Sequence, residues 1–164
     1  MDISCEVCGA KITGFDSCRD VYNKLSFYTL SRPDQKFFIH QCAVDAYAAQ
    51  HASENTKPIT TAFALIGLNL FVNYHYTGKQ VQNAHIELAK NKREWPVFIQ
   101  PEKKAKITVA DALKAKHGEE RDQMIKEWAI AVWDMWKNQH GAVMELLTPY
   151  LTINEERQQK NKIS

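Results

Sequence analysis

The sequence predicts a single all-α domain over residues 1–164, a bundle of five to six helices that follows a short cysteine-rich arm at residues 1–18. Three observations predict this fold class. Apolar residues recur at spacings of three and four along most of the chain, no segment shows a convincing strand pattern, and 45% of the residues are hydrophobic, as in ordinary globular proteins. A chain of 164 residues can also bury a sizeable core without disulfides.

Two long helices are expected directly after the arm. Ser17 is a residue type that caps helices, and the segment 18–31 places its apolar side chains near one face. The letters SRPDQ then supply a turn, with Pro33 at the first position of a second helix, which runs to about residue 53. One face of that second helix carries Phe37, His40, Val44, Tyr47 and His51.

The middle of the chain predicts two further helices and a loop. The segment 61–80 is apolar almost all round, so we expect this helix at the buried centre of the bundle. Another helix covers residues 79–92. The segment 93–107 holds two prolines, and it should form an ordered surface loop that packs Trp95 and Phe98 inward.

The C-terminal third predicts two more helices. A short one spans residues 108–118, with Thr108 as its cap and Asp111 three residues later, as in a capping box. A long helix carrying three tryptophans covers residues 119–147, and the last residues, 150–164, are expected to form a flexible tail.

The composition limits the classes of function. The 21 Lys and Arg residues nearly balance the 19 Asp and Glu residues, which argues against nucleic-acid binding unless basic side chains cluster on one face of the fold. The first residues show no secretory signal, and the longest apolar run, TAFALIGLNLFV, is shorter than the roughly 20 residues of a membrane span. We therefore expect a cytoplasmic protein with a protein or small-molecule partner and no membrane contact.

Three cysteines lie within the first eighteen residues and point to a metal. Cys5 and Cys8 form a Cys-x-x-Cys pair, which supplies two thiolates from one tight turn, and Gly9 suits the backbone of such a turn. Cys18 opens the first predicted helix, whose dipole favours a thiolate. Disulfides are not expected in a reducing compartment, and no βαβ pattern supports a thioredoxin-like redox pair.

The fourth ligand is predicted from helix geometry. If the first two long helices form an antiparallel hairpin, Cys18 faces the end of the second helix, where His51 lies. His40 precedes His51 by 11 residues, about 16 Å along the axis, and Cys42 points about 200° around the helix from His40. We predict a structural Zn²⁺ on Cys5, Cys8, Cys18 and His51, with His40 as the first alternative and Cys42 as the second.

Three segments carry a resemblance to a known family. They are CEVCG, HQCAVDAYAAQH and WAIAVWDMWKNQH. This combination resembles an uncharacterised bacterial group, domain-of-unknown-function family 5946, and the resemblance extends over nearly the whole chain. Members often carry proline after the last histidine of the second segment, whereas Ala52 stands here, so the end of that helix is less sharply defined. The resemblance implies that these three segments belong to one family pattern, but it implies no activity.

A second polar site inside the bundle is the alternative hypothesis. His40, Asp45, Tyr47 and His140 could contribute to it, with His75 or His85 as a third histidine, and an open metal position would then activate water. The spacing of paired ligands on one helix is absent, so the simpler interpretation is that these side chains hydrogen-bond within the core, with Asp45 and Tyr47 as partners.

Two functional hypotheses follow. In the first, the protein is a small zinc-binding helical module that binds a partner or ligand and catalyses no reaction. In the second, it is a metal-dependent hydrolase or transferase with a histidine-lined site in the bundle. The sequence alone does not choose between an enzyme and a binding protein.

Overall fold

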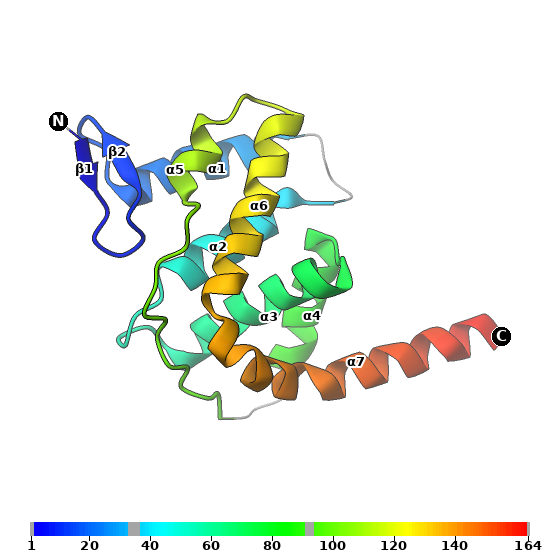
Figure 1. Cartoon of the computed structure of the whole chain (residues 1–164). Helices are drawn as coiled ribbons and strands as arrows, with labels where there is room; N and C mark the ends of the chain where they lie inside the picture. The colour runs from blue at the N-terminus through cyan, green and yellow to red at the C-terminus, as the bar shows by residue number, and fades with distance from the viewer. Residues whose placement is uncertain (1, 33–36, 91–93, 164) are drawn as a thin grey trace.

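Seven α-helices and one short hairpin make up the part of the chain that the computed structural model describes, residues 2–32, 37–90 and 94–163 (Figure 1). The all-α prediction is confirmed, although there is one helix more than expected. In chain order the elements are β1 (Asp2–Ser4), β2 (Lys11–Thr13), α1 (Cys18–Ser31), α2 (Ile39–Gln50), α3 (Pro58–Tyr74), α4 (Gly78–Ala89), α5 (Val109–Lys114), α6 (Glu119–Met135), the 3₁₀ turn η1 (Lys137–Gln139) and α7 (His140–Ile163).

The N-terminal arm is a two-stranded antiparallel hairpin, which the sequence analysis did not predict. Ile3 pairs with Ile12 at the centre of the register, and the side chain of Ile12 is buried against the bundle. Each strand is only three residues long, so neither is long enough to display the two-residue alternation that reveals a strand in a sequence.

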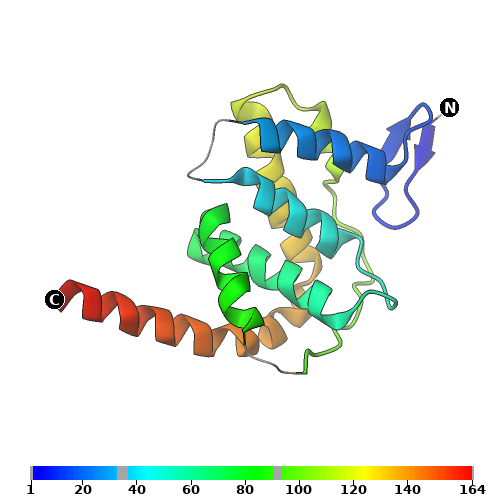
Figure 2. The same ribbon diagram turned by 180° about the vertical axis from the view of Figure 1, so that it is seen from behind.

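Helices α1 and α2 lie side by side and run antiparallel, as expected (Figures 1 and 2). The start of α1 is fixed by a capping box between Ser17 and Asp20. The prediction that α2 begins at Pro33 falls on a residue outside the described ranges, but Phe37 and Phe38 are described and are not helical, so that boundary was wrong. Phe37 is instead drawn toward α4, where its carbonyl accepts the N–H of Gly78.

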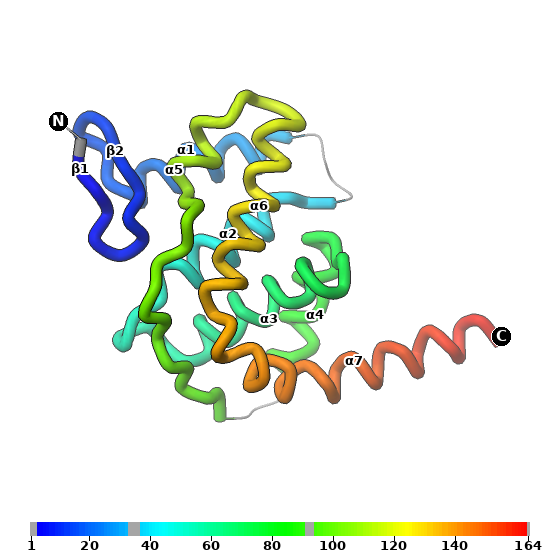
Figure 3. Tube along the Cα trace, viewed as in Figure 1, coloured from blue at the N-terminus to red at the C-terminus, as the bar shows by residue number. Residues whose placement is uncertain are grey.

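Helix α3 occupies the centre of the bundle, as predicted, and packs against α2, α4, α6 and α7. Leu65, Ile66, Leu68 and Leu70 of this helix are fully buried. The loop prediction is also confirmed, because Phe98 is buried and the ring of Trp95 meets Phe63 edge-on. Figure 3 follows this extended segment along the side of the bundle up to α5.

The single long helix predicted for residues 119–147 is wrong, because α6 ends at Met135 and α7 begins at His140. The break lets the indole of Trp136 turn inward and donate from Nε1 to the carbonyl of Ala49 at 3.1 Å. Residues 150–163 continue α7 and project away from the bundle, so they are helical, while their flexibility stays a prediction (Figure 1). Within the described residues, no helix combines the length and apolar character needed to cross a membrane.

A buried carboxyl group lies between α2 and α3. Asp45 is 4% exposed, and its Oδ1 accepts a hydrogen bond from Gln41 at 3.1 Å. Its Oδ2 lies directly over Gly67, where an added Cβ would come within 2.0 Å of that oxygen. Burial raises the pKa of Asp45 well above its ordinary value, and the bond from Gln41 lowers it by less. The absence of a side chain at residue 67 therefore makes room for a carboxyl group that favours its neutral form.

The contact between Asp45 and Gly67 predicts that substitution by alanine has opposite effects on stability at two glycines. Gly67→Ala should destabilise the protein by about 3 kcal/mol, because α2 and α3 would have to separate to admit the methyl group. Gly141→Ala is the matched control, since nothing lies within 4 Å of its added Cβ, and it should stabilise α7 by up to about 1 kcal/mol. The free energy of unfolding in urea measures both. Similar values for the two variants would contradict the packing.

Asp45 also predicts a pH dependence of stability. A carboxyl group whose pKa is raised by folding stabilises the native state fully below its unfolded pKa of about 4, and this stability is lost as the pH rises through the native pKa. Asp45→Asn keeps the shape without the ionisation, so its stability relative to wild type should grow from pH 4.5 to pH 8. Asp134→Asn, at an exposed position of α6, is the matched control. If the free energy of unfolding of Asp45→Asn and that of the wild type changed in parallel with pH, this would contradict a neutral Asp45.

Candidate metal centre

The turn of the hairpin places the first two thiols side by side. The N–H of Cys5 donates to the carbonyl of Ala10, the N–H of Gly9 donates to the carbonyl of Cys5, and the N–H of Ala10 donates to Cys8 Sγ at 3.4 Å. Gly9 has φ +81°, a conformation that other residues rarely adopt. The backbone of the turn thus folds the Cys-x-x-Cys pair and donates a hydrogen bond to one of its sulfurs.

Cys18 brings the third sulfur from the first residue of α1. Its Sγ lies 3.7 Å from Cys8 Sγ and 3.3 Å from Nε2 of His51. The capping box before it fixes where α1 starts, so the direction of the Cys18 side chain is set by the helix rather than by the loop.

His51 directly follows α2, whose end lies beside the start of α1 because the two helices are antiparallel. Its Nδ1 lies 3.0 Å from the carbonyl of Tyr47 and therefore carries the proton, because a carbonyl only accepts. The imidazole also stacks on the Tyr47 ring, with centroids 4.0 Å apart. These two contacts leave the lone pair of Nε2 directed toward the thiols of Cys18 and Cys5, at 3.3 and 3.9 Å.

The ligand atoms of Cys5, Cys8, Cys18 and His51 all lie within 4.8 Å of one another. A tetrahedral zinc ion with Zn–S bonds of about 2.3 Å separates neighbouring sulfurs by about 3.8 Å, close to the 3.7 Å between Cys8 and Cys18. Three thiols and one imidazole nitrogen are also a common ligand set for structural zinc. The donor set and its spacing both fit a metal ion.

Hydrogen bonds among the four ligand side chains favour a thiolate at Cys8. The hydrogen bond with Cys18 is the main reason that the pKa of Cys8 falls to about 4, against the opposing effect of burial. The same bond raises the pKa of Cys18. Burial by itself would lower the pKa of His51, but its bonds to Cys8 and to the Tyr47 carbonyl raise it. The group therefore holds a thiolate beside an imidazole, and a cation would replace the shared protons.

Two tyrosines and an arginine cover one side of the group. Tyr22 of α1 stacks on Tyr47 of α2 at 4.1 Å, and the guanidinium of Arg19 lies over both rings. Burial raises the pKa of Tyr47 to about 12, with a further contribution from the charge of Cys18. Sequence reasoning placed Tyr47 in a second site and overlooked Arg19 and Tyr22. The only available signal was the four-residue spacing of Tyr47 and His51, which puts the carbonyl of one beside the ring of the other.

The two alternative ligands lie elsewhere. His40 sits near the start of α2, where its Nδ1 meets the hydroxyl of Thr29 at 2.8 Å, and burial lowers its pKa. Cys42 is buried inside the bundle, where burial raises the pKa of its thiol. Neither side chain joins the four-ligand group.

The proposed second polar site is not assembled. His140 stacks on Trp133 at 3.7 Å and its Nε2 donates to the carbonyl of that residue, while His85 donates to the carbonyl of Phe63. Asp45 bonds to Gln41 rather than to Tyr47, which corrects the expectation that these two residues are partners. Over residues 2–32, 37–90 and 94–163, the Cys₃His group is the only cluster with the spacing of a metal site.

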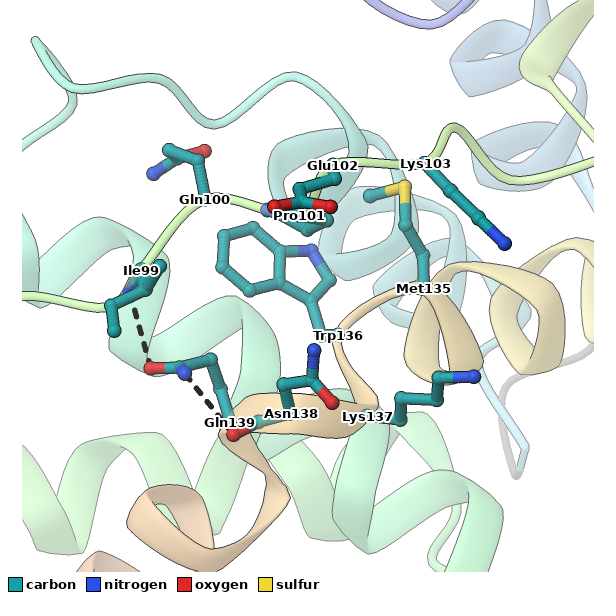
Figure 4. Close-up of a pocket in the computed structure, with 10 residues that line it drawn as sticks. All are labelled: Ile99, Gln100, Pro101, Glu102, Lys103, Met135, Trp136, Lys137, Asn138 and Gln139. Carbon is teal, nitrogen blue, oxygen red and sulfur yellow. Dashed lines mark hydrogen bonds between the residues drawn. The ribbon is translucent and has the colours of Figure 1, made fainter.

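A cavity of about 270 Å³ lies over the indole of Trp136, away from the metal ligands (Figure 4). Figure 4 shows the indole between the segment that carries Pro101 and the turn that carries Asn138. The N–H of Ile99 donates to Oε1 of Gln139 across one end and joins the two walls. The carboxamides and charges around this cavity do not converge on one point, so it defines no chemistry by itself.

The chain was compared with protein families, with curated proteins and with solved structures. No curated protein and no solved structure matches the chain. The model of one family, described as a family of unknown function (DUF5946), matches residues 3–137. The matched region contains the hairpin from Ile3 onward, the four clustered ligands and helices α1 to α6, and it leaves α7 outside. Because the match covers most of the chain, the protein belongs to the DUF5946 family.

Proposed function

We propose that this protein is a zinc-binding helical module of the cytoplasm, in which one structural Zn²⁺ is held by the Cys₃His group. The observation that carries the proposal is the convergence of three sulfurs and Nε2 of His51 within 4.8 Å. Imidazole with thiolates in a tetrahedral arrangement favours zinc over hard cations such as Mg²⁺ and Ca²⁺, which prefer oxygen ligands.

The ion would act as a structural tie. The hairpin buries little apolar side-chain surface of its own, with Cys8, Ala10 and Ile12 as its contribution to the core. Zinc would join this hairpin to the start of α1 and to the end of α2, three segments that are far apart in sequence. All four cysteines are free thiols, so none of the three cysteine ligands is engaged in a disulfide.

A binding role fits this centre better than catalysis. Four protein ligands complete a tetrahedral zinc site and leave no position for a water molecule or a substrate. The histidines that a hydrolase would need are separated, because His40 contacts Thr29 of α1 while His140 stacks on Trp133. The protein would therefore act through a surface that the zinc centre holds in shape.

Removal of one thiol tests the metal centre. Cys8→Ser should reduce the zinc content from one ion per chain to nearly none. It should also destabilise the protein by about 3 kcal/mol, or roughly 10 °C in Tm, because the arm is no longer tied to the helices. Cys42→Ala is the matched control, since this buried thiol lies outside the group, and it should retain one zinc. Elemental analysis and thermal unfolding measure the two effects. Full zinc content in Cys8→Ser would refute the site.

The two histidines of α2 and its C-terminus provide a separate test of the fourth ligand. His51→Ala should weaken zinc binding by at least about 100-fold, because an imidazole ligand is lost, whereas His40→Ala should leave it unchanged. Competition with a chelator gives the affinity. In cobalt-substituted protein, His51→Ala should keep the sulfur-to-metal absorption of three thiolates. An equal loss of affinity in both variants would mean that His51 is not the fourth ligand.

A further inference from the structure

A second groove lies beside the hairpin, between β2, α1 and α5, which neighbour one another in Figures 1 and 2. Its volume is about 300 Å³. The lining residues come from all three elements and the turn between the first two: Lys11, Ile12, Thr13, Asp16, Val21, Lys24, Ala110, Leu113 and Lys114. None of them is a ligand of the metal centre, so the groove is a distinct feature of the same end of the molecule.

The floor of the groove is apolar. Ile12, Val21 and Ala110 each expose 7% or less of their surface, and Leu113 is half-buried beside them. These side chains belong to the edge of the core, and the groove gives access to them from outside. An occupant would therefore gain from placing small apolar side chains here.

The rim of the groove is cationic. Three lysines stand around it against a single aspartate, and Asp16 is already paired with Lys24 at 2.5 Å. Lys11 on β2 and Lys114 on α5 form no ion pair with any described residue. The two ammonium groups come from different elements that line the groove, so an anionic group in the groove could contact both of them.

The wall formed by β2 presents unpaired backbone groups. In an antiparallel pair, alternate residues hydrogen-bond across the ladder and the others point away from it. The bond from Cys5 N–H to the Ala10 carbonyl and the register of the hairpin assign the ladder bonds to Ile3 and Ile12. The N–H and C=O groups of Lys11 and Thr13 therefore point to the outer edge of β2, and they make no hydrogen bond with the described residues.

We infer that this groove binds an extended acidic segment of a partner protein, which adds a third strand along the outer edge of β2. Backbone groups of the segment would bond to Lys11 and Thr13. Side chains of a strand alternate between its two faces. Apolar residues of the segment would therefore face the floor beside Ile12, and acidic residues would face Lys11 and the other lysines.

The same observations separate this occupant from other anions. A small free anion would use the lysines but would leave the apolar floor and the strand edge without partners. A nucleic acid would use the lysines, but none of the groove residues is an aromatic side chain on which a base could stack. A peptide uses the cations, the floor and the edge together. The inference rests on the proposed function, because β2 belongs to the arm that zinc would hold in place.

The test uses the full chain and a dye-labelled seven-residue peptide in which glutamate alternates with valine, followed by fluorescence anisotropy. Lys11→Glu combined with Lys114→Glu should weaken binding at least about tenfold, because two attractions become repulsions. The matched control reverses two lysines at the Trp136 cavity, Lys103→Glu with Lys137→Glu, and should change the affinity less than about twofold. An equal loss of affinity in both double variants would show that only the net charge of the protein matters, and it would overturn the inference.

Modified peptides test the added strand without altering the protein. In an extended peptide the N–H groups of the valines lie on one edge and those of the glutamates on the other. Methylation of one of these two sets of nitrogens should abolish binding, and methylation of the other set should not. Equal binding of both methylated peptides would overturn strand addition. Tighter binding of a dye-labelled decathymidylate, lost in the same lysine double variant, would overturn a peptide in favour of nucleic acid.

Zinc content is measured on the same samples, so that the two proposals fail separately. Both lysine double variants should keep one zinc per chain, because neither alters a ligand. A wild type that holds zinc but does not bind the peptide would overturn this inference and leave the metal centre standing. A wild type that holds no zinc but binds the peptide through Lys11 and Lys114 would overturn the metal centre and support the groove.

Discussion

The end of α2 is the point on which the remaining structure depends. Two buried indoles hold it: Trp128 of α6 donates to Oε1 of Gln50 at 2.8 Å, and Trp136, directly after α6, donates to the carbonyl of Ala49 at 3.1 Å. Gln50 in turn donates to the carbonyl of Ile107, on the segment that leads into α5. The two indole bonds are buried and would be costly to break, since the polar groups that they satisfy have no access to water. They fix the position of His51, the next residue.

A fixed His51 gives the cysteines a common target. The hairpin and the start of α1 bring sulfurs from two directions, and the stacked rings of Tyr22 and Tyr47 close one side of the group. The Cys8 thiolate is buried and needs a compensating charge, which the shared protons supply in part and a divalent cation would supply more fully. The chemistry of the group therefore follows from how rigidly α2 is held against α6.

The arm links the two features to which we assign function. One part of the hairpin carries Cys5 and Cys8, and β2 forms a wall of the lysine-rimmed groove. A two-stranded ribbon is marginally stable by itself, so the edge offered by β2 depends on what anchors the hairpin to the helices. The amine of Lys104 adds one anchor by donating to the carbonyl of Glu6. The proposed metal would be the stronger anchor. The affinity of a partner that binds the edge of β2 would therefore depend on whether the metal is bound.

Local sequence signals were enough for much of this protein. They predicted the all-α class, the bounds of α1, the buried position of α3, the capping box at Thr108 and the grouping of the three N-terminal cysteines, because periodicity, capping and ligand spacing act over a few residues. His51 is 33 residues from Cys18 and was predicted from one further assumption, that the first two helices form an antiparallel hairpin. Tertiary packing decided the rest. The break between α6 and α7 follows from where the indole of Trp136 finds an acceptor, and α2 starts late because the backbone at Phe37 bonds to Gly78. Asp45 is accommodated by Gly67 of another helix, and the groove requires three separate elements to meet. Each of these features depends on contacts between residues distant in the chain, and no local pattern in a sequence encodes which distant residue will be the neighbour.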